Sequence, residues 1–217
     1  MAVTTELVLV RHGEANNNRT GTVGGEHGCT GLTFHGRNQV EPLAKRLATE
    51  HHDRPYTAFY GSPRRRVLET IEVLTATLPL KATILDDLRG PDHGDADGLQ
   101  WRDVKSAFGG PPQHNPDEPY ATGSETWNAY LARATTTLQQ IIDKHLGERI
   151  LIAGHGETIE AVHVLLMQLP APVRLNLGFV TDHASLTRWQ QHVNRFDRRT
   201  WMLAAHNDTR HLAGAKP

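Results

Sequence analysis

The chain has 217 residues, and its 23 Lys and Arg side chains balance 24 Asp and Glu, giving a net charge of -1 with its 14 histidines neutral. A chain of this length buries about 70% of the surface that its unfolded form exposes, so it needs no disulfide bonds to hold a core. The balanced charge argues against a dedicated nucleic-acid or membrane-surface binder. The single cysteine, Cys29, excludes an intrachain disulfide. Without a long apolar run or a visible secretory signal, the sequence predicts a cytoplasmic protein.

The N-terminal third predicts two strands, each followed by a helix. Residues 6–10 (ELVLV) form a short apolar run that is typical of a buried strand. Apolar residues at helical spacing then predict a helix over residues 33–50. A second strand is expected at residues 56–61. Ser62 and Pro63 follow it and predict the cap and the first turn of a second helix.

The middle of the chain predicts little regular structure. Residues 80–85 are expected to be extended, and residues 86–123 are rich in Gly, Pro and Asp. So long a connection is uncommon in a compact domain and is usually functional. Ser124 is the expected cap of a helix that ends near His145. We therefore expect an insertion over residues 86–146 that covers the functional site.

The remaining elements complete an alternating pattern. Residues 149–153 (RILIA) predict a third buried strand, followed by a helix over residues 157–169. Further strands are expected at residues 176–180, 183–190 and 200–204. Alternation of strands and helices is typical of the α/β class. The whole chain, residues 1–217, is therefore predicted to form a single domain, a three-layer sandwich with a mostly parallel sheet and helices on both faces.

Polar clusters follow three of these strands, and in such sheets ligands bind beyond the carboxyl ends of the strands. Arg11 and His12 follow the first strand, Arg66 comes after the second, and His155 follows the third. A neutral imidazole can act as a nucleophile, and the adjacent Arg11 disfavours protonation of His12. Two guanidinium groups and a second imidazole would stabilise a phosphoryl group in its transition state. This chemistry requires no metal ion and no cofactor.

The sequence resembles the histidine phosphatase superfamily, which contains the cofactor-dependent phosphoglycerate mutases. The resemblance covers nearly the whole chain and rests on five segments in the family's order. They are LVLVRHGEANNN, LTFHGRNQ, SPRRRVLET, AGHGET and WMLAAHNDTRHL, at residues 7–18, 32–39, 62–70, 153–158 and 201–212.

This resemblance implies that His12 is the phosphorylated nucleophile and that Arg11, Asn18, Arg66 and His155 bind the substrate phosphate. It implies a phosphomonoester hydrolase that acts through a phosphohistidine on a small phosphorylated metabolite. We expect no metal, no cofactor, and neither nucleic acid nor membrane as partner. A monomer and a homodimer are both compatible with the sequence.

One segment departs from the family pattern. The family's acidic proton donor falls on Gly90, in LRGPDHGDADG at residues 88–98. Glycine cannot transfer a proton, and general acid catalysis contributes roughly 10²–10⁴-fold. We favour Asp92 as the replacement donor. The other candidates are His93, Asp87, Asp95 and Glu14.

Three alternative functions remain. A phosphoglycerate-type mutase would need further basic residues near its pocket, and residues 90–125 contain only Arg102 and Lys105. Because Gly90 cannot act as a proton donor, the chain is also compatible with a non-catalytic domain that binds a phosphorylated ligand. A metal-dependent hydrolase is suggested by the histidine content, but the tight ligand spacing of zinc sites is absent.

Overall fold

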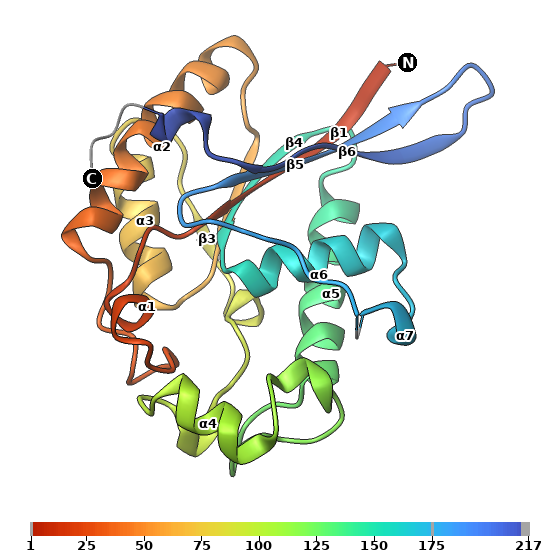
Figure 1. Cartoon of the computed structure of the whole chain (residues 1–217). Coiled ribbons are helices and arrows are strands. Elements are labelled where there is room, and N and C mark those ends of the chain that lie inside the picture. Colours follow the sequence, from red (N-terminus) through yellow and green to blue (C-terminus); the bar gives the residue numbers. More distant parts are fainter. Residues whose placement is uncertain (1, 175, 214–217) are drawn as a thin grey trace.

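A six-stranded mixed sheet forms the centre of the computed structural model, which describes residues 2–174 and 176–213 (Figure 1). The strand order is β3-β2-β4-β1-β5-β6. The first four strands of this order pair in parallel, whereas β5 and β6 are antiparallel. The strands are β1 (Ala2–Arg11), β2 (Ala58–Gly61), β3 (Thr83–Ile84), β4 (Arg149–Gly154), β5 (Leu186–Val193) and β6 (Arg199–Asp208). The predicted α/β class and mostly parallel sheet are confirmed.

Helices cover both faces of this sheet because successive side chains of each strand point to opposite faces. On β1, Leu7 and Leu9 pack in one core cluster with α5 and α6, whereas Val8 and Val10 pack in a second cluster with α2 and α3. Figure 1 shows the two helix pairs on opposite sides of the strands. Their bounds are α2 (Phe34–Asp53), α3 (Arg65–Thr75), α5 (Trp127–Lys144) and α6 (Gly156–Met167).

Shorter helices lie at the periphery. They are α1 (Asn16–Thr20), α4 (Trp101–Phe108) and α7 (Ala171–Arg174), with 3₁₀ turns at Asp86–Leu88, Gly94–Ala96, Pro112–His114 and Arg210–Leu212. None of the helices within residues 2–174 and 176–213 is long and apolar enough to cross a membrane.

The long connection between β3 and α5 holds a small core of its own. Val104 of α4 packs with Ala96 and with Val23 from the loop after α1. Figure 1 places α4 below the sheet, away from the helices that cover its faces. By contrast, α5 contributes to the main core through residues such as Leu138. The connection over residues 85–126 is therefore narrower than the expected insertion over residues 86–146, and its first residues, Leu85 and Leu88, still pack in the main core.

Two helix starts differ from the prediction. Helix α3 begins at Arg65 after the N-cap residue Arg64, so Ser62 does not cap it and Pro63 is not its first residue. The Ser62 hydroxyl instead forms a hydrogen bond with Nε2 of His155, which is far away in the sequence. This tertiary contact replaces the local helix cap. Helix α5 begins after Thr126, whose hydroxyl accepts the N–H of Ala129 at 3.1 Å.

One predicted strand was wrong, and the residue predicted to cap α5 has another role. Residues 176–180 do not form a strand but are part of an irregular connection between α7 and β5. Ser124, the expected cap of α5, accepts the N–H of Ala121 at 3.1 Å and so stabilises the turn before the helix.

The register of the sheet brings three chain segments together. Arg11 at the end of β1 pairs with Gly154 at the end of β4. The N–H of Ser62, just after β2, donates to the carbonyl of Ala153 at 3.3 Å. The residues that follow these three strands therefore meet at one edge of the sheet.

Candidate active site

Two histidines and one arginine form the buried centre of this edge. His12 directly follows β1, His155 lies between β4 and α6, and Arg66 belongs to the first turn of α3. Their exposed fractions are 3% for His12, 0% for His155 and 7% for Arg66. The structure therefore unites three residues that are far apart in the sequence and that were predicted as one site.

The Arg66 guanidinium joins the two imidazoles. Its Nε donates to Nε2 of His12 at 3.0 Å, and its Nη2 donates to Nδ1 of His155 at 3.0 Å. Its third nitrogen, Nη1, donates to the carbonyl of Gly24 at 2.7 Å. The ring centroids of the two histidines are 5.5 Å apart. A planar group with several fixed donors thus holds both rings in place.

These contacts define the tautomer of each histidine. Nδ1 of His12 lies 2.7 Å from the carbonyl oxygen of Gly13, which can only accept, so Nδ1 carries the proton. The lone pair of His12 is then on Nε2, where Arg66 donates. In His155 the assignment is reversed, because Nδ1 accepts from Arg66 and Nε2 donates to the Ser62 hydroxyl at 2.8 Å.

Burial and positive charge keep both imidazoles neutral. Burial lowers the pKa of His12 well below its ordinary value, and the charges of Arg66 and Arg11 lower it further. Burial also lowers the pKa of His155, with Arg66 and Arg64 adding to the effect. Each ring therefore retains an unprotonated nitrogen at neutral pH, which a nucleophile requires.

These lowered pKa values predict an acid-dependent loss of stability. An unfolded histidine takes up a proton near pH 6.5, whereas buried His155 resists protonation until a lower pH, so acid favours the unfolded state. Below about pH 6.5, His155 is expected to lower the free energy of unfolding by about 1.4 kcal/mol per pH unit. Urea unfolding at pH 7, 6 and 5 should therefore show a shallower pH dependence for His155→Gln than for the unsubstituted protein. Parallel pH curves would contradict this assignment.

Arg11 lies beside the two histidines. One of its nitrogens donates to the carbonyl of Thr181, while its buried Nε has no hydrogen-bond partner among the described residues. A Cβ on Gly156 would lie 3.7 Å from that Nε, which places Arg11 against the start of α6. His183, which the sequence analysis did not single out, lies near the same site, 5.7 Å from the His12 ring. Arg11 thus offers a donor that an anion can use.

Asn18 lies at a less central position than the other predicted phosphate-binding residues. Its side chain is exposed, and its Oδ1 accepts the N–H of Ala15 at 3.1 Å. In the described part of the chain, no hydrogen bond joins it to the histidines or to Arg66. The neighbouring Asn17 is 5% exposed and packs against Gly24, the residue whose carbonyl receives Arg66. The phosphate-binding role of Asn18 stays a prediction.

Asp92, the expected proton donor, is exposed and is part of a turn. Its Oδ1 accepts the N–H of Gly94 at 3.2 Å. Within the described ranges no hydrogen bond or ion pair joins it to His12, Arg66 or His155, and it does not line the cavity beside Gly90. The side chain of the next residue, His93, is buried and lines that cavity.

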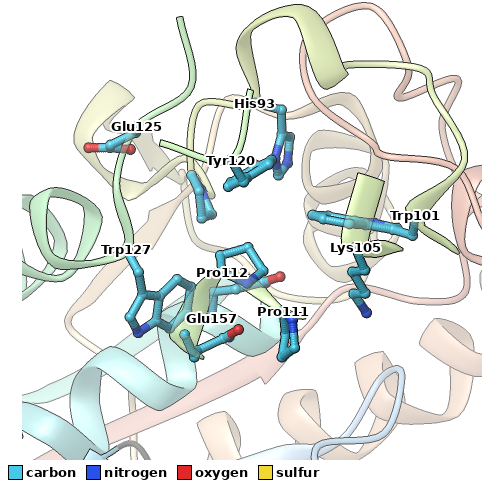
Figure 2. Close-up of a pocket in the computed structure, with 11 residues that line it drawn as sticks. His93, Trp101, Lys105, Pro111, Pro112, Tyr120, Glu125, Trp127 and Glu157 are labelled. Carbon is cyan, nitrogen blue, oxygen red and sulfur yellow. The ribbon is translucent and has the colours of Figure 1, made fainter. Parts of the chain in front are cut away.

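A cavity of about 200 Å³ lies next to Gly90 and is lined by Pro91 and His93. A Cβ on Gly90 would lie 3.8 Å from Cδ2 of His155, which relates this cavity to the histidine pair. Figure 2 shows aromatic and proline side chains around it, with His93 and Glu157 on its walls. Burial lowers the pKa of His93 to about 4, so this imidazole is also neutral. Its lining residues are Pro91, His93, Trp101, Lys105, Pro111, Pro112, Gln113, Tyr120, Glu125, Trp127 and Glu157. The cavity can hold a small organic group next to a phosphate at the histidines.

Residues 7–209 match the model of the histidine phosphatase superfamily (branch 1), and the chain belongs to this family. It is 32% identical over 163 residues to phosphoglycerate mutase-like protein 4 of Arabidopsis thaliana, spanning 73% of this chain and 69% of the relative. It is 29% identical over 191 residues to a metal-independent phosphoserine phosphatase of the same plant, spanning 85% and 79% of the two chains.

The fold is also similar to that of solved structures. A mycobacterial glucosyl-3-phosphoglycerate phosphatase superposes with a TM-score of 0.78 at 23% identity, covering 95% of this chain and 99% of that one. The predicted family membership is confirmed, and the chain is an enzyme of the phosphatase type.

Proposed function

We propose that the chain hydrolyses a phosphomonoester of a small metabolite through a phosphohistidine on His12. The observation that carries this proposal is the neutral His12, whose Nε2 lone pair faces the Arg66 guanidinium at 3.0 Å. A substrate phosphate would take over the Arg66 donor and bring its phosphorus to Nε2. Arg11 and His155 would contact the remaining oxygens and stabilise the charge of the transition state.

The reaction has two displacement steps. In the first, Nε2 of His12 attacks phosphorus, the P–N bond forms, and the P–O bond to the leaving group breaks. In the second, water attacks the phosphohistidine, the P–N bond breaks, and phosphate leaves. The Gly13 carbonyl accepts from Nδ1–H in the structure and would stabilise the positive charge on the phosphorylated ring. No step passes through a metal ion.

The cavity beside the histidines supports a small substrate. Its volume of about 200 Å³ and its aromatic walls suit the organic part of a metabolite. One basic side chain, Lys105, lines it, and this ammonium group lies 5.3 Å from the centre of the Trp101 ring. A relative is named for phosphoserine, so a substrate panel should include that compound together with sugar phosphates.

The test is phosphate release from this panel, including p-nitrophenyl phosphate, in the presence of EDTA. We expect release that survives chelation, because the two-step chemistry uses only protein side chains. Loss of activity in EDTA would instead indicate a metal-dependent hydrolase. Exchange between 3- and 2-phosphoglycerate that outpaces phosphate release would assign the chain to the mutases, and phosphate binding without turnover would assign it to the binding modules.

A further inference from the structure

Position 90, where the family has its acidic proton donor, holds a glycine and so has no side chain that could give a proton. Gly90 is buried, and a Cβ at this position would lie 3.8 Å from Cδ2 of His155. A carboxyl group here would therefore reach the reacting centre, but glycine supplies none. A phosphomonoester with an alkyl leaving group still needs a proton on its departing oxygen. Another residue that faces the same space must provide it.

Most nearby acidic groups already have other partners. Asp97 accepts the backbone N–H groups of Gly25, His27 and Gly28 at 2.7–3.0 Å, so it holds the glycine-rich loop. Asp92 accepts the N–H of Gly94. Asp97 thus has a structural role, and exposed Asp92 lies in a turn and does not line the cavity.

Two carboxylates line the cavity, and only one of them is available. Glu125 binds the Arg133 guanidinium through both oxygens, at 3.0 and 2.6 Å. Glu157 has neither a hydrogen bond nor an ion pair among residues 2–174 and 176–213. Figure 2 shows its carboxylate directed into the ring of lining residues. The histidine in the wall, His93, is already hydrogen-bonded through Nδ1 to the Tyr120 hydroxyl.

Glu157 also lies at the junction between the phosphate site and the cavity. It belongs to the first turn of α6, two residues after His155. Burial lowers the pKa of Arg11, and the largest opposing influence is the charge of Glu157. The same charge is the largest influence opposing the effect of burial on the pKa of His93, on the cavity side. Glu157 is therefore close to both the phosphate-binding arginine and the wall of the leaving-group cavity.

We propose that Glu157 is the general acid that protonates the leaving group, replacing the donor absent at Gly90; this rests on the proposed function. As His12 attacks phosphorus and the P–O bond breaks, the Glu157 carboxyl gives its proton to the departing oxygen and becomes a carboxylate. In the second step the carboxylate takes a proton from the attacking water. The oxygen of that water bonds to phosphorus while the P–N bond breaks, and Glu157 is again protonated.

The experiment compares two substrates that differ in their need for a proton. Glycerol 2-phosphate has an alkoxide leaving group, whereas the leaving group of p-nitrophenyl phosphate needs little protonation. For Glu157→Gln, kcat/KM is expected to fall by about 10²–10³-fold on glycerol 2-phosphate and by less than about fivefold on p-nitrophenyl phosphate.

Glu160→Gln is the matched control. Glu160 lies on the next turn of α6, and its carboxyl does not line the cavity. This substitution is expected to leave the activity ratio of the two substrates unchanged. Equal losses on both substrates in Glu157→Gln, or the same selective loss in Glu160→Gln, would overturn the proposal. Failure of the unsubstituted enzyme to hydrolyse p-nitrophenyl phosphate would instead contradict the proposed function, because that substrate does not depend on the donor.

Discussion

Replacing His12 with glutamine is expected to lower kcat/KM on p-nitrophenyl phosphate by a factor on the order of 10⁴ or more. Glutamine is neutral and polar like the buried imidazole, but its amide has no nucleophilic lone pair. Arg66 and Arg11 stay in place, so the variant should still bind phosphate. Rapid-quench trapping with a ³²P-labelled substrate should find labelled protein for the unsubstituted enzyme and none for His12→Gln.

His145→Gln serves as the control for this loss. His145 lies before β4, at the opposite end of that strand from His155, and its ring contacts Tyr60 and Glu148. Its replacement removes a histidine at the far end of β4 without touching the site, so activity of the folded protein is expected to stay within about twofold. Turnover by His12→Gln at a rate near that of the control would exclude His12 as the nucleophile.

The apolar patterns of the sequence predicted the central layers well. The strand expected at residues 6–10 and the one expected at residues 149–153 both lie within observed strands and pair in parallel. Short apolar runs of this kind must be buried on both faces, which leaves few alternatives to a central parallel strand. Since the carboxyl ends of parallel strands meet at one edge, the approach of His12 to His155 followed from the same reasoning.

Local patterns failed where a distant contact decided the structure. Ser62 followed by Pro63 has the form of a helix cap, but the hydroxyl of Ser62 receives the N–H of His155 instead. Residues 176–180 have the apolar character of a strand, yet the connection continues past the site, where the Thr181 carbonyl receives Arg11. Residue spacing along the chain could not identify His155 as the partner of Ser62, or Arg11 as the partner of Thr181.

Glu157 shows a second limit of sequence reasoning. An acidic residue in the first turn of a helix is common, because it complements the helix dipole. Its type and position therefore carried no signal of their own. What distinguishes Glu157 is the absence of a partner within the described structure and its place in the cavity wall, and both depend on how residues 85–126 fold over the site.

A buried charge cluster in the middle of β1, where β4 begins beside it, gives the largest expected effect on stability. Glu6 is 0% exposed and binds the Arg149 guanidinium through Oε2. Its Oε1 accepts from Arg188 at 2.9 Å and from Gln190 at 2.8 Å. Burial alone would raise the pKa of Glu6, but these hydrogen bonds and the two arginine charges lower it below its ordinary value.

Glu6→Gln is expected to lower the free energy of unfolding by about 3–5 kcal/mol, because Glu50 is then the carboxylate left to pair with both buried Arg149 and Arg188. Activity should be retained in the folded fraction, since six residues of strand separate Glu6 from His12 by about 20 Å. Urea unfolding at pH 7 measures the stability change, and p-nitrophenyl phosphate hydrolysis at low temperature measures the activity.

The pH dependence provides an independent check on the origin of this effect. Because the folded-state pKa of Glu6 is lowered, its contribution is present at neutral pH and is lost as the pH falls below the unfolded value near 4.3. The difference between Glu6→Gln and the unsubstituted protein should therefore shrink in acid. Glu148→Gln, which removes a 41% exposed carboxylate paired with His145, is expected to cost less than about 1 kcal/mol. Equal losses in the two variants would show that burial of the charge does not determine the stability of the cluster.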